Sequence, residues 1–352
     1  MNRLLMCVLC LLAAGCAEPY APPSFEMSPD EARQRPMPGF TFYFATDLHG
    51  SERCFRKFLN AGKFYGVDAV ILGGDVAGKA LIPVVSGPGG SFEAHAYGRS
   101  YRAEGEDGLA SLEDRIRGLG CYPYRTTPDQ LLAMRNDPEQ LNRAFEQVIS
   151  ETLERWISMA EDRLRAAGLP CLVMPGNDDP PWVRRLLDQA EWLQQAEERI
   201  VEFGPYQVLS LGYSTPTPWD SPREITEDEM RGKLSALAGQ LDPGRPVIFN
   251  LHNPPFGTAT DRAFKLDGDL RIKTAGGEPL QEPVGSHAIR ESIEEVQPVV
   301  ALCGHIHESR ATSKLGRTVV VNPGSQYPEG VLQGSVLALN RAKVTSHRFV
   351  TG

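Results

Sequence analysis

Gly304-His305-Ile306-His307 is the stretch from which the rest of the sequence can be interpreted. It follows an apolar run, Pro298 to Cys303, whose β-branched start is typical of a buried strand. If the backbone stays extended, side chains two residues apart point the same way, so both imidazoles face one pocket. Imidazole suits Zn, Mn, Fe, Co and Ni, so the pair indicates a metal site. Two surface histidines in a turn are the alternative for this motif taken alone.

The same pattern, a strand-like run that ends at a candidate metal ligand, occurs at four other places in the chain. With the histidine pair, the candidates are Asp47 with His49, Asp75, Asn177, His252, and His305 with His307. Four of the seven histidines fall at these strand ends. Because the ligands of α/β sheets bind beyond the carboxyl ends of the strands, all five ends are expected to converge.

The order of the segments predicts an α/β fold. A strand over 40–46, helical spacing over 51–65 and a strand over 67–72 form a βαβ unit with parallel strands. Residues 78–130 break this rhythm and are interpreted as an insertion. Elsewhere we expect helices over 128–167, 182–197, 225–240 and 287–296, a loop over 257–285, and strands over 170–174, 199–203, 206–213, 246–251, 298–303, 317–321, 331–339 and 343–350.

In this order the motifs DxH, GGD, GN, H and GHxH resemble those of the calcineurin-like metallophosphoesterases, over roughly residues 40–340. The resemblance implies a metallophosphoesterase-type α/β sandwich, two mixed β-sheets flanked by helices, in a domain over residues 39–352 that contains the insertion. It also implies two divalent metal ions (Mn, Fe, Zn, Co or Ni). By the resemblance, one ion is bound by Asp47, His49 and His307, the other by Asn177, His252 and His305, and both by Asp75.

Such a set of residues suits the hydrolysis of a phosphate ester. Two divalent ions about 3.5–4 Å apart hold a bridging hydroxide and two phosphate oxygens, and so support in-line attack on phosphorus. We therefore expect a phosphodiesterase or phosphomonoesterase that acts on a small phosphate-ester molecule. A non-catalytic binding scaffold on the same fold is the alternative, although a scaffold would tolerate the loss of ligands and every ligand type is present here.

Asp178 departs from the family pattern, in which many members carry a histidine after Gly-Asn that protonates the leaving group or orients the substrate. An aspartate is ionised at neutral pH, and neighbouring cations favour that form further. We expect Asp178 to be a poor general acid and to orient a water, a histidine or a substrate hydroxyl. His287 is a candidate phosphate contact, with a solvated histidine in the first turn of a helix as the alternative.

The N-terminal residues are interpreted as a signal peptide over 1–15. One positive charge at Arg3 precedes an apolar run from Leu4 to Leu12, which is too short to span a bilayer. The following Ala-Ala-Gly-Cys16 resembles a bacterial lipobox, which implies lipidation of Cys16 and a Pro-rich tether over 16–38. We expect an exported lipoprotein on the periplasmic face, in the outer membrane if the source is Gram-negative. A plain secretory signal with an incidental cysteine is the alternative.

Composition limits the partners. The 352 residues carry a formal net charge of −9, which argues against a nucleic-acid groove because such grooves are basic. Beyond the N-terminal segment, the cysteines have no regular spacing and no CxxC motif, so no disulfide framework is predicted.

The lipid anchor leads to the first prediction. Cys16→Ala should release the protein from the membrane fraction, because the acyl chains that hold it there can no longer be attached. Fractionation of cells that express either form, with a high-salt wash of the pellet, measures this. A variant that stays in the washed pellet would show that Cys16 is not the anchor.

Overall fold

The computed structural model describes residues 39–352. The predicted signal peptide over 1–15 and the tether over 16–38, including Cys16, lie outside the described residues. Within residues 39–352, none of the helices combines the length and the apolar character that crossing a membrane requires.

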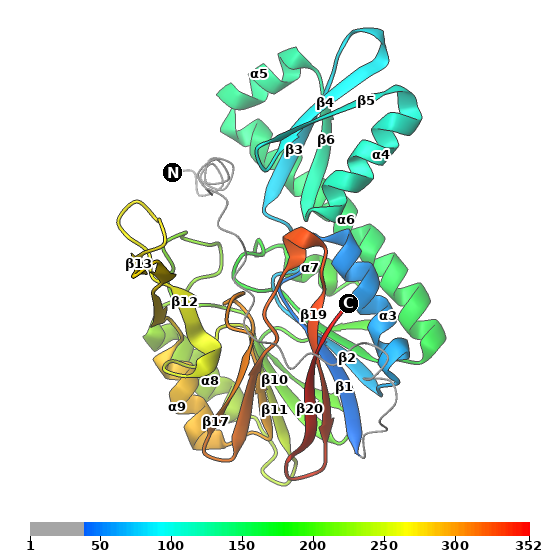
Figure 1. The fold of residues 1–352 in the computed structure, drawn as a ribbon. Helices are drawn as coiled ribbons and strands as arrows, with labels where there is room; N and C mark the ends of the chain where they lie inside the picture. Colours follow the sequence, from blue (N-terminus) through cyan, green and yellow to red (C-terminus); the bar gives the residue numbers. More distant parts are fainter. Residues whose placement is uncertain (1–38) are drawn as a thin grey trace.

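Two six-stranded sheets form the body of the molecule (Figure 1). The first has the order β20-β19-β1-β2-β7-β8, with strands β1 (Phe40–Ala45), β2 (Ala69–Gly73), β7 (Cys171–Met174), β8 (Leu193–Gln195), β19 (Gln333–Leu339) and β20 (Val344–Thr351). The second has the order β17-β18-β16-β11-β10-β9, with strands β9 (Arg199–Phe203), β10 (Tyr206–Leu211), β11 (Val247–Leu251), β16 (Val300–Leu302), β17 (Ala311–Leu315) and β18 (Thr318–Asn322). Both sheets are mixed: their central strands are parallel, and antiparallel strands lie at one edge of the first sheet (β19 and β20) and at both edges of the second (β17 and β9).

Alternation of side chains along the strands explains how the sheets pack. In β1, Phe42 and Phe44 join a core shared with strands of the second sheet, whereas Tyr43 and Ala45 join the core beneath the helices. Burial of each such aromatic side chain contributes about 1.5–3 kcal/mol, so the register of β1 is strongly specified. The predicted sandwich of two mixed sheets flanked by helices is thereby confirmed.

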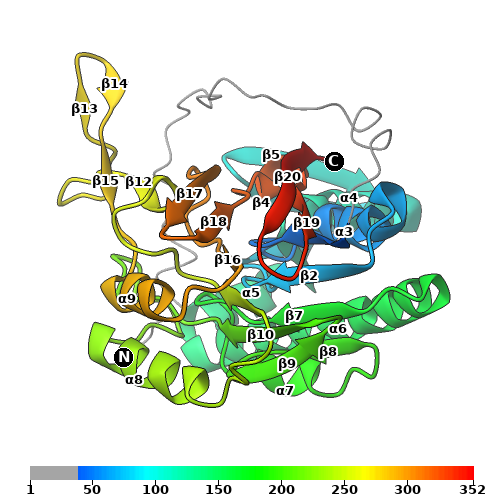
Figure 2. The same ribbon diagram turned by 90° about the horizontal axis from the view of Figure 1, so that it is seen from below.

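Helices cover the outer face of each sheet (Figures 1 and 2). On the first sheet these are α3 (Glu52–Tyr65), α6 (Pro138–Ala167) and the short α7 (Val183–Leu187). On the second they are α8 (Glu227–Ala238) and α9 (His287–Val296). The side chain of Ser286 caps α9 by accepting a hydrogen bond from the backbone N–H of Ile289, at 3.2 Å.

Residues 80–126, here called the insertion lobe, form a third unit at the top of Figure 1. Its four-stranded sheet has the order β5-β4-β3-β6, and its helix α4 packs on that sheet around a small core of its own. The elements are β3 (Ala80–Ser86), η2 (Pro88–Gly90), β4 (Ser91–Ala96), β5 (Arg99–Glu104), α4 (Gly105–Gly118) and β6 (Cys121–Thr126). Since β3 follows β2 after a short loop, the lobe emerges from the carboxyl end of the first sheet.

Three segments differ from the sequence-based prediction, and the strand β17 was not predicted. The helix expected over 128–167 is two helices, α5 (Pro128–Asn136) and α6, because Asp137 is extended and caps α6 while Pro138 occupies its first position. The helix expected over 182–197 is present only as α7, which ends at Leu187; beyond it the prediction is wrong, because β8 follows. Within 257–285 lie η3 (Ala259–Asp261), β12 (Arg262–Phe264), β15 (Gln281–Pro283) and a projecting hairpin of β13 (Thr274–Ala275) and β14 (Glu278–Pro279) (Figure 2). A final short helix, η4 (Tyr327–Glu329), precedes β19.

Candidate metal centre

The structure brings all seven predicted ligands together at the carboxyl ends of five strands. Three of these strands, β1, β2 and β7, are neighbours in the first sheet, and β11 and β16 are neighbours in the second. Backbone hydrogen bonds join the loops that follow β1 and β2: Asp47 donates to Gly74 at 3.0 Å and His49 to Asp75 at 2.9 Å. Across the sandwich, the backbone N–H of His305 donates to the Asp47 carboxylate. The ligands therefore meet because the carboxyl ends of all five strands lie at the same end of the sandwich.

Asp47, His49 and His307 form the first group of ligand atoms. The Nε2 atoms of the two histidines lie 3.0 Å apart. Asp47 Oδ1 is 3.8 Å from His49 Nε2 and 3.4 Å from His307 Nε2. Three atoms with lone pairs close to a common point, with Asp47 and His49 buried, form a suitable site for a cation.

Asp75 lies between the first group and His252. Its Oδ2 atom is 3.5 Å from His49 Nε2 and 3.3 Å from His252 Nε2. Its other oxygen, Oδ1, accepts a hydrogen bond of 3.0 Å from the backbone N–H of Asp178. Oδ2 thus faces both His49 and His252, while Oδ1 is held by the Asp178 backbone.

Asn177, His305 and His252 are the second group of candidate ligands. Asn177 Oδ1 lies 2.7 Å from His305 Nδ1, and Asn177 Nδ2 donates to Ser221 Oγ at 2.8 Å. Ser221 Oγ in turn donates to Glu224 Oε1 at 2.6 Å. This chain of hydrogen bonds orients the amide so that its carbonyl oxygen, the atom able to bind a metal, faces the site.

The surroundings of His252 show whether these residues fit a metal ion. Its Nδ1 lies 3.0 Å from the carbonyl oxygen of Gly73 and therefore carries a proton that it donates. Its Nε2 is buried without a hydrogen-bond partner and faces the carboxylates of Asp75 and Asp47. Burial lowers the pKa of His252, but these carboxylates raise it more strongly, to about 10, so without a metal Nε2 holds a proton that supplies positive charge between them. A cation bound there would replace that proton, because metal binding takes the deprotonated nitrogen. The donor set therefore fits divalent cations.

Backbone strain is concentrated at this site. Among non-glycine residues, Asp47, His49, Asp75 and His305 have positive φ values of 55°, 42°, 49° and 66°. Such conformations persist only where the surroundings enforce them, and they cluster at functional sites. At Gly176 and Gly304 any Cβ atom would collide with the carboxylates of Asp75 and Asp47, respectively, so the glycines of the GN and GHxH motifs permit close packing.

Three further side chains hold the loops, and one of them, Asp179, was not singled out as functional from the sequence. Asp179 accepts hydrogen bonds from the backbone N–H groups of Val76, Ala77 and Gly176, and thus joins the loops after β2 and β7. Asn322 donates to the carbonyl oxygens of Gly304 and Ile306. In the same turn, Ser325 Oγ donates to the carbonyl oxygen of Asp47 at 2.7 Å. The Asn-Pro-Gly-Ser segment is thus a turn that supports the site.

Asp178 is paired with Lys79 at the edge of the site. Its Oδ2 lies 4.0 Å from His49 Nδ1. Burial raises the pKa of Asp178, but the positive charge of Lys79 outweighs burial and holds the pKa below its ordinary value. The pKa of His49 is lowered by burial and by Lys79. An ionised Asp178 cannot donate a proton to a leaving group, and the role of Asp178 stays a prediction.

Tyr327 and His287 occupy different positions relative to the centre. The ring of Tyr327 packs on His49, with centroids 4.6 Å apart, and on His307 at 5.8 Å. Burial raises the pKa of Tyr327 to about 12. His287 instead stacks on Phe256 at 3.9 Å and is absent from the described groups of ligand atoms. Its proposed contact with phosphate stays a prediction.

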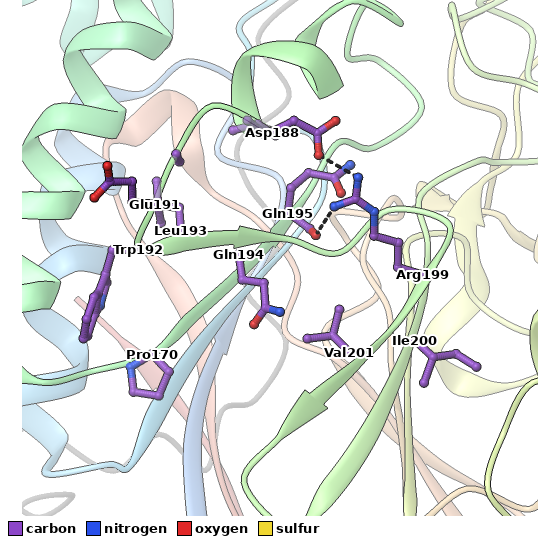
Figure 3. A pocket seen from close by; sticks show the side chains of 12 residues that line it. Pro170, Asp188, Glu191, Trp192, Leu193, Gln194, Gln195, Arg199, Ile200 and Val201 are labelled. Atoms are coloured by element: carbon purple, nitrogen blue, oxygen red, sulfur yellow. Dashed lines mark hydrogen bonds and ion pairs between the residues drawn. The ribbon is translucent and has the colours of Figure 1, made fainter.

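A surface pocket of about 480 Å³ lies elsewhere, next to the edge strands β8 and β9 (Figure 3). Trp192, Gln195 and Arg199 line it, and Arg199 donates to Asp188 and to the backbone carbonyl of Gln195. None of the predicted metal ligands is among its lining residues. The candidate metal centre is therefore defined by its donor atoms rather than by this pocket.

Comparisons with known proteins place the fold. No protein-family model matches the sequence. The uncharacterized protein MJ1162 of Methanocaldococcus jannaschii is 31% identical over 155 residues, which make up 43% of this chain and 62% of that protein. The chain thus matches less than two thirds of that relative's length.

Among solved structures, one chain with 16% identity has a TM-score of 0.52 and is matched over 88% of this chain and 98% of its own length. The protein TT1561 of Thermus thermophilus has 17% identity and a TM-score of 0.50, with 89% and 98% covered. At these identities the two similarities show the fold. Yfce, a phosphoesterase from E. coli, matches with 10% identity and a TM-score of 0.32, over 88% of this chain and 98% of its own.

The position of Asp75 leads to a prediction. Asp75→Asn should lower turnover of a phosphate ester by more than about 100-fold and reduce bound metal. Loss of a residue that only hydrogen-bonds to a metal ligand already lowers metal affinity or activity about 10–100-fold, and loss of a ligand should lower them further. The thermal stability of the metal-free protein should be unchanged or higher, because burial and Asp178 disfavour the Asp75 carboxylate there. Elemental analysis, turnover and calorimetry measure the three effects.

The matched control is Asp68→Asn, at the opposite end of β2, where the carboxylate accepts hydrogen bonds from Thr41. It should leave metal content and turnover unchanged. Two ions per chain and full turnover in Asp75→Asn would contradict the role of Asp75.

Proposed function

We propose that this protein is a dinuclear-metal-dependent hydrolase of phosphate esters. The observation that carries the proposal is Asp75 Oδ2, which lies within 3.5 Å of histidine nitrogens from both groups of candidate ligands. A single carboxylate oxygen in that position suits contact with two cations at once. In the proposal, His49, His307 and Asp47 hold one ion and His252, His305 and Asn177 the other, although Asp47 Oδ1 lies 3.8 Å from both His49 Nε2 and His252 Nε2.

When bound, two divalent ions would supply Lewis-acid activation of water and of the phosphate group. The chain's own residues provide the geometry. The Asp178 backbone fixes Asp75, Ser221 fixes the Asn177 amide, and Gly73 fixes the tautomer of His252. Because these partners hold the donors before substrate arrives, little rearrangement is needed during the reaction.

A non-catalytic scaffold on the same fold is the second candidate. No observation favours it: every predicted donor is present, and the donors converge. Metal content and hydrolysis together distinguish the two functions. A scaffold that binds two ions but hydrolyses no ester would retain the geometry without the chemistry.

The test of the proposed function is hydrolysis by the metal-reconstituted protein. We expect turnover of p-nitrophenyl phosphate, bis-p-nitrophenyl phosphate or both, abolished by a chelator and restored by Mn, Fe, Zn, Co or Ni. A panel of nucleotides, cyclic nucleotides, phospholipid head groups and sugar phosphates then identifies the substrate class. Protein that binds two ions yet hydrolyses none of these esters would support the scaffold instead.

We further propose that the enzyme acts on small molecules outside the cytoplasm, anchored to a membrane through lipidated Cys16. The signal-like segment over 1–15 and the Pro-rich residues over 16–38 support this location. The net charge of −9 makes a nucleic-acid substrate unfavourable.

Asp178 leads to a prediction about the leaving group. Aryl phosphates need no protonation of the leaving group and should react well, whereas alkyl phosphates should be slow, because general acid catalysis is worth about 10²–10⁴-fold. Asp178→His should therefore raise turnover of an alkyl ester more than that of an aryl ester. Steady-state kinetics on a matched pair of esters measures the ratio.

Asp178→Asn is the control, since it removes the charge of the carboxylate without adding a group that titrates near neutral pH. It should not improve the alkyl-to-aryl ratio. If the histidine variant raises both rates equally, or lowers both, Asp178 does not occupy the position of the acid.

A further inference from the structure

Lys79 is a charged residue beside the metal centre that has no part in the proposed function so far. It follows Asp75 by four residues, at the end of the loop that leads from β2 into the insertion lobe. Its ammonium group forms an ion pair with Asp178. The Asp178 carboxylate lies within 4.8 Å of ligand atoms of His49 and Asp75. The ammonium is therefore held at the edge of the metal centre.

The backbone that leads to Lys79 is rigid. Val76 and Ala77 donate to the buried Asp179 carboxylate at 3.0 and 2.6 Å, and Gly78 donates to the buried Tyr122 hydroxyl at 2.7 Å. A side chain at Gly78 would collide with the backbone of Gly120. Three consecutive backbone groups are thus fixed by buried partners, which restricts the positions that the lysine side chain can reach.

The Lys79–Asp178 pair is open to solvent on one side. The Lys79 side chain is 38% exposed, so water screens the pair and reduces what it contributes to folding. An ammonium group has three N–H donors, so it can bind a second anion while it contacts Asp178. Lysine is also protonated at neutral pH and is a common phosphate-binding residue in proteins.

We propose that Lys79 binds an anionic oxygen of the substrate's phosphate group, while Asp178 holds the ammonium in position. This inference rests on the proposed function. In a phosphate monoester, which has three non-bridging oxygens, two divalent ions would hold two of them when bound, and the third would remain for a fixed ammonium to stabilise. The same contact should form with inorganic phosphate, the product of monoester hydrolysis, so binding can be measured without turnover.

The test compares phosphate binding by metal-reconstituted variants in isothermal titration calorimetry, after metal content has been measured in each. In Lys79→Met, the affinity for inorganic phosphate should fall about 10- to 100-fold, the range expected for loss of one hydrogen bond to a charged group. KM for p-nitrophenyl phosphate should rise in parallel. Lys79→Arg, which keeps the charge, should recover part of the affinity.

Lys233→Met is the matched control. Lys233 also pairs with a carboxylate, that of Glu198, and is 34% exposed, but it lies on α8 outside the described groups of ligand atoms. It should bind phosphate as the wild type does. Lys79→Gln repeats the test with a second neutral side chain, in case Lys79→Met folds poorly.

The outcomes separate the two proposals. Neutral variants at position 79 that keep both metals and bind phosphate with wild-type affinity would overturn the role of Lys79 and leave the hydrolase intact. A wild-type protein that binds no metal and hydrolyses no ester would overturn the proposed function itself.

Discussion

The burial of several carboxylates at one point is the constraint on which the site depends. Asp47 and Asp75 are each 1% exposed, and Asp179 is fully buried beside them. Buried charges are strongly unfavourable unless positive charge or hydrogen bonds compensate them. Three backbone N–H groups compensate Asp179, whereas Asp47 and Asp75 each accept from one backbone N–H group, that of His305 and that of Asp178, and otherwise face histidine nitrogens. A fold that gathers these groups therefore favours cations between them.

The sandwich architecture makes this gathering possible. Parallel central strands of both sheets end at one edge, and the loops beyond them are joined by backbone hydrogen bonds and by the Asp179 and Asn322 side chains. These contacts enforce the left-handed backbone of four candidate ligands. The packed cores on either side of each sheet hold the strands, and with them this strained backbone, in place.

The sequence predicts much of the fold and the candidate ligands, because both depend on local patterns. Strands that end at Asp75 or His252 are apolar runs followed by a polar residue, and the polar residues meet wherever parallel strands do. Lys79, Tyr327 and Ser221 could not be found in this way, since their importance arises from contacts between residues far apart in the chain. The error over 182–197 has a similar cause: pairing of β8 with β7 overrides a helix-like local pattern. By contrast, the break at Asp137 and Pro138 is visible in the sequence.

The most direct test of the account is a crystal structure of the protein grown with Mn²⁺, with anomalous diffraction used to locate the ions. The account predicts two peaks about 3.5–4 Å apart, with Asp75 Oδ2 in contact with both, His49 and His307 on one side, and His252 and Asn177 on the other. A single peak, or peaks remote from Asp75, would contradict the dinuclear centre.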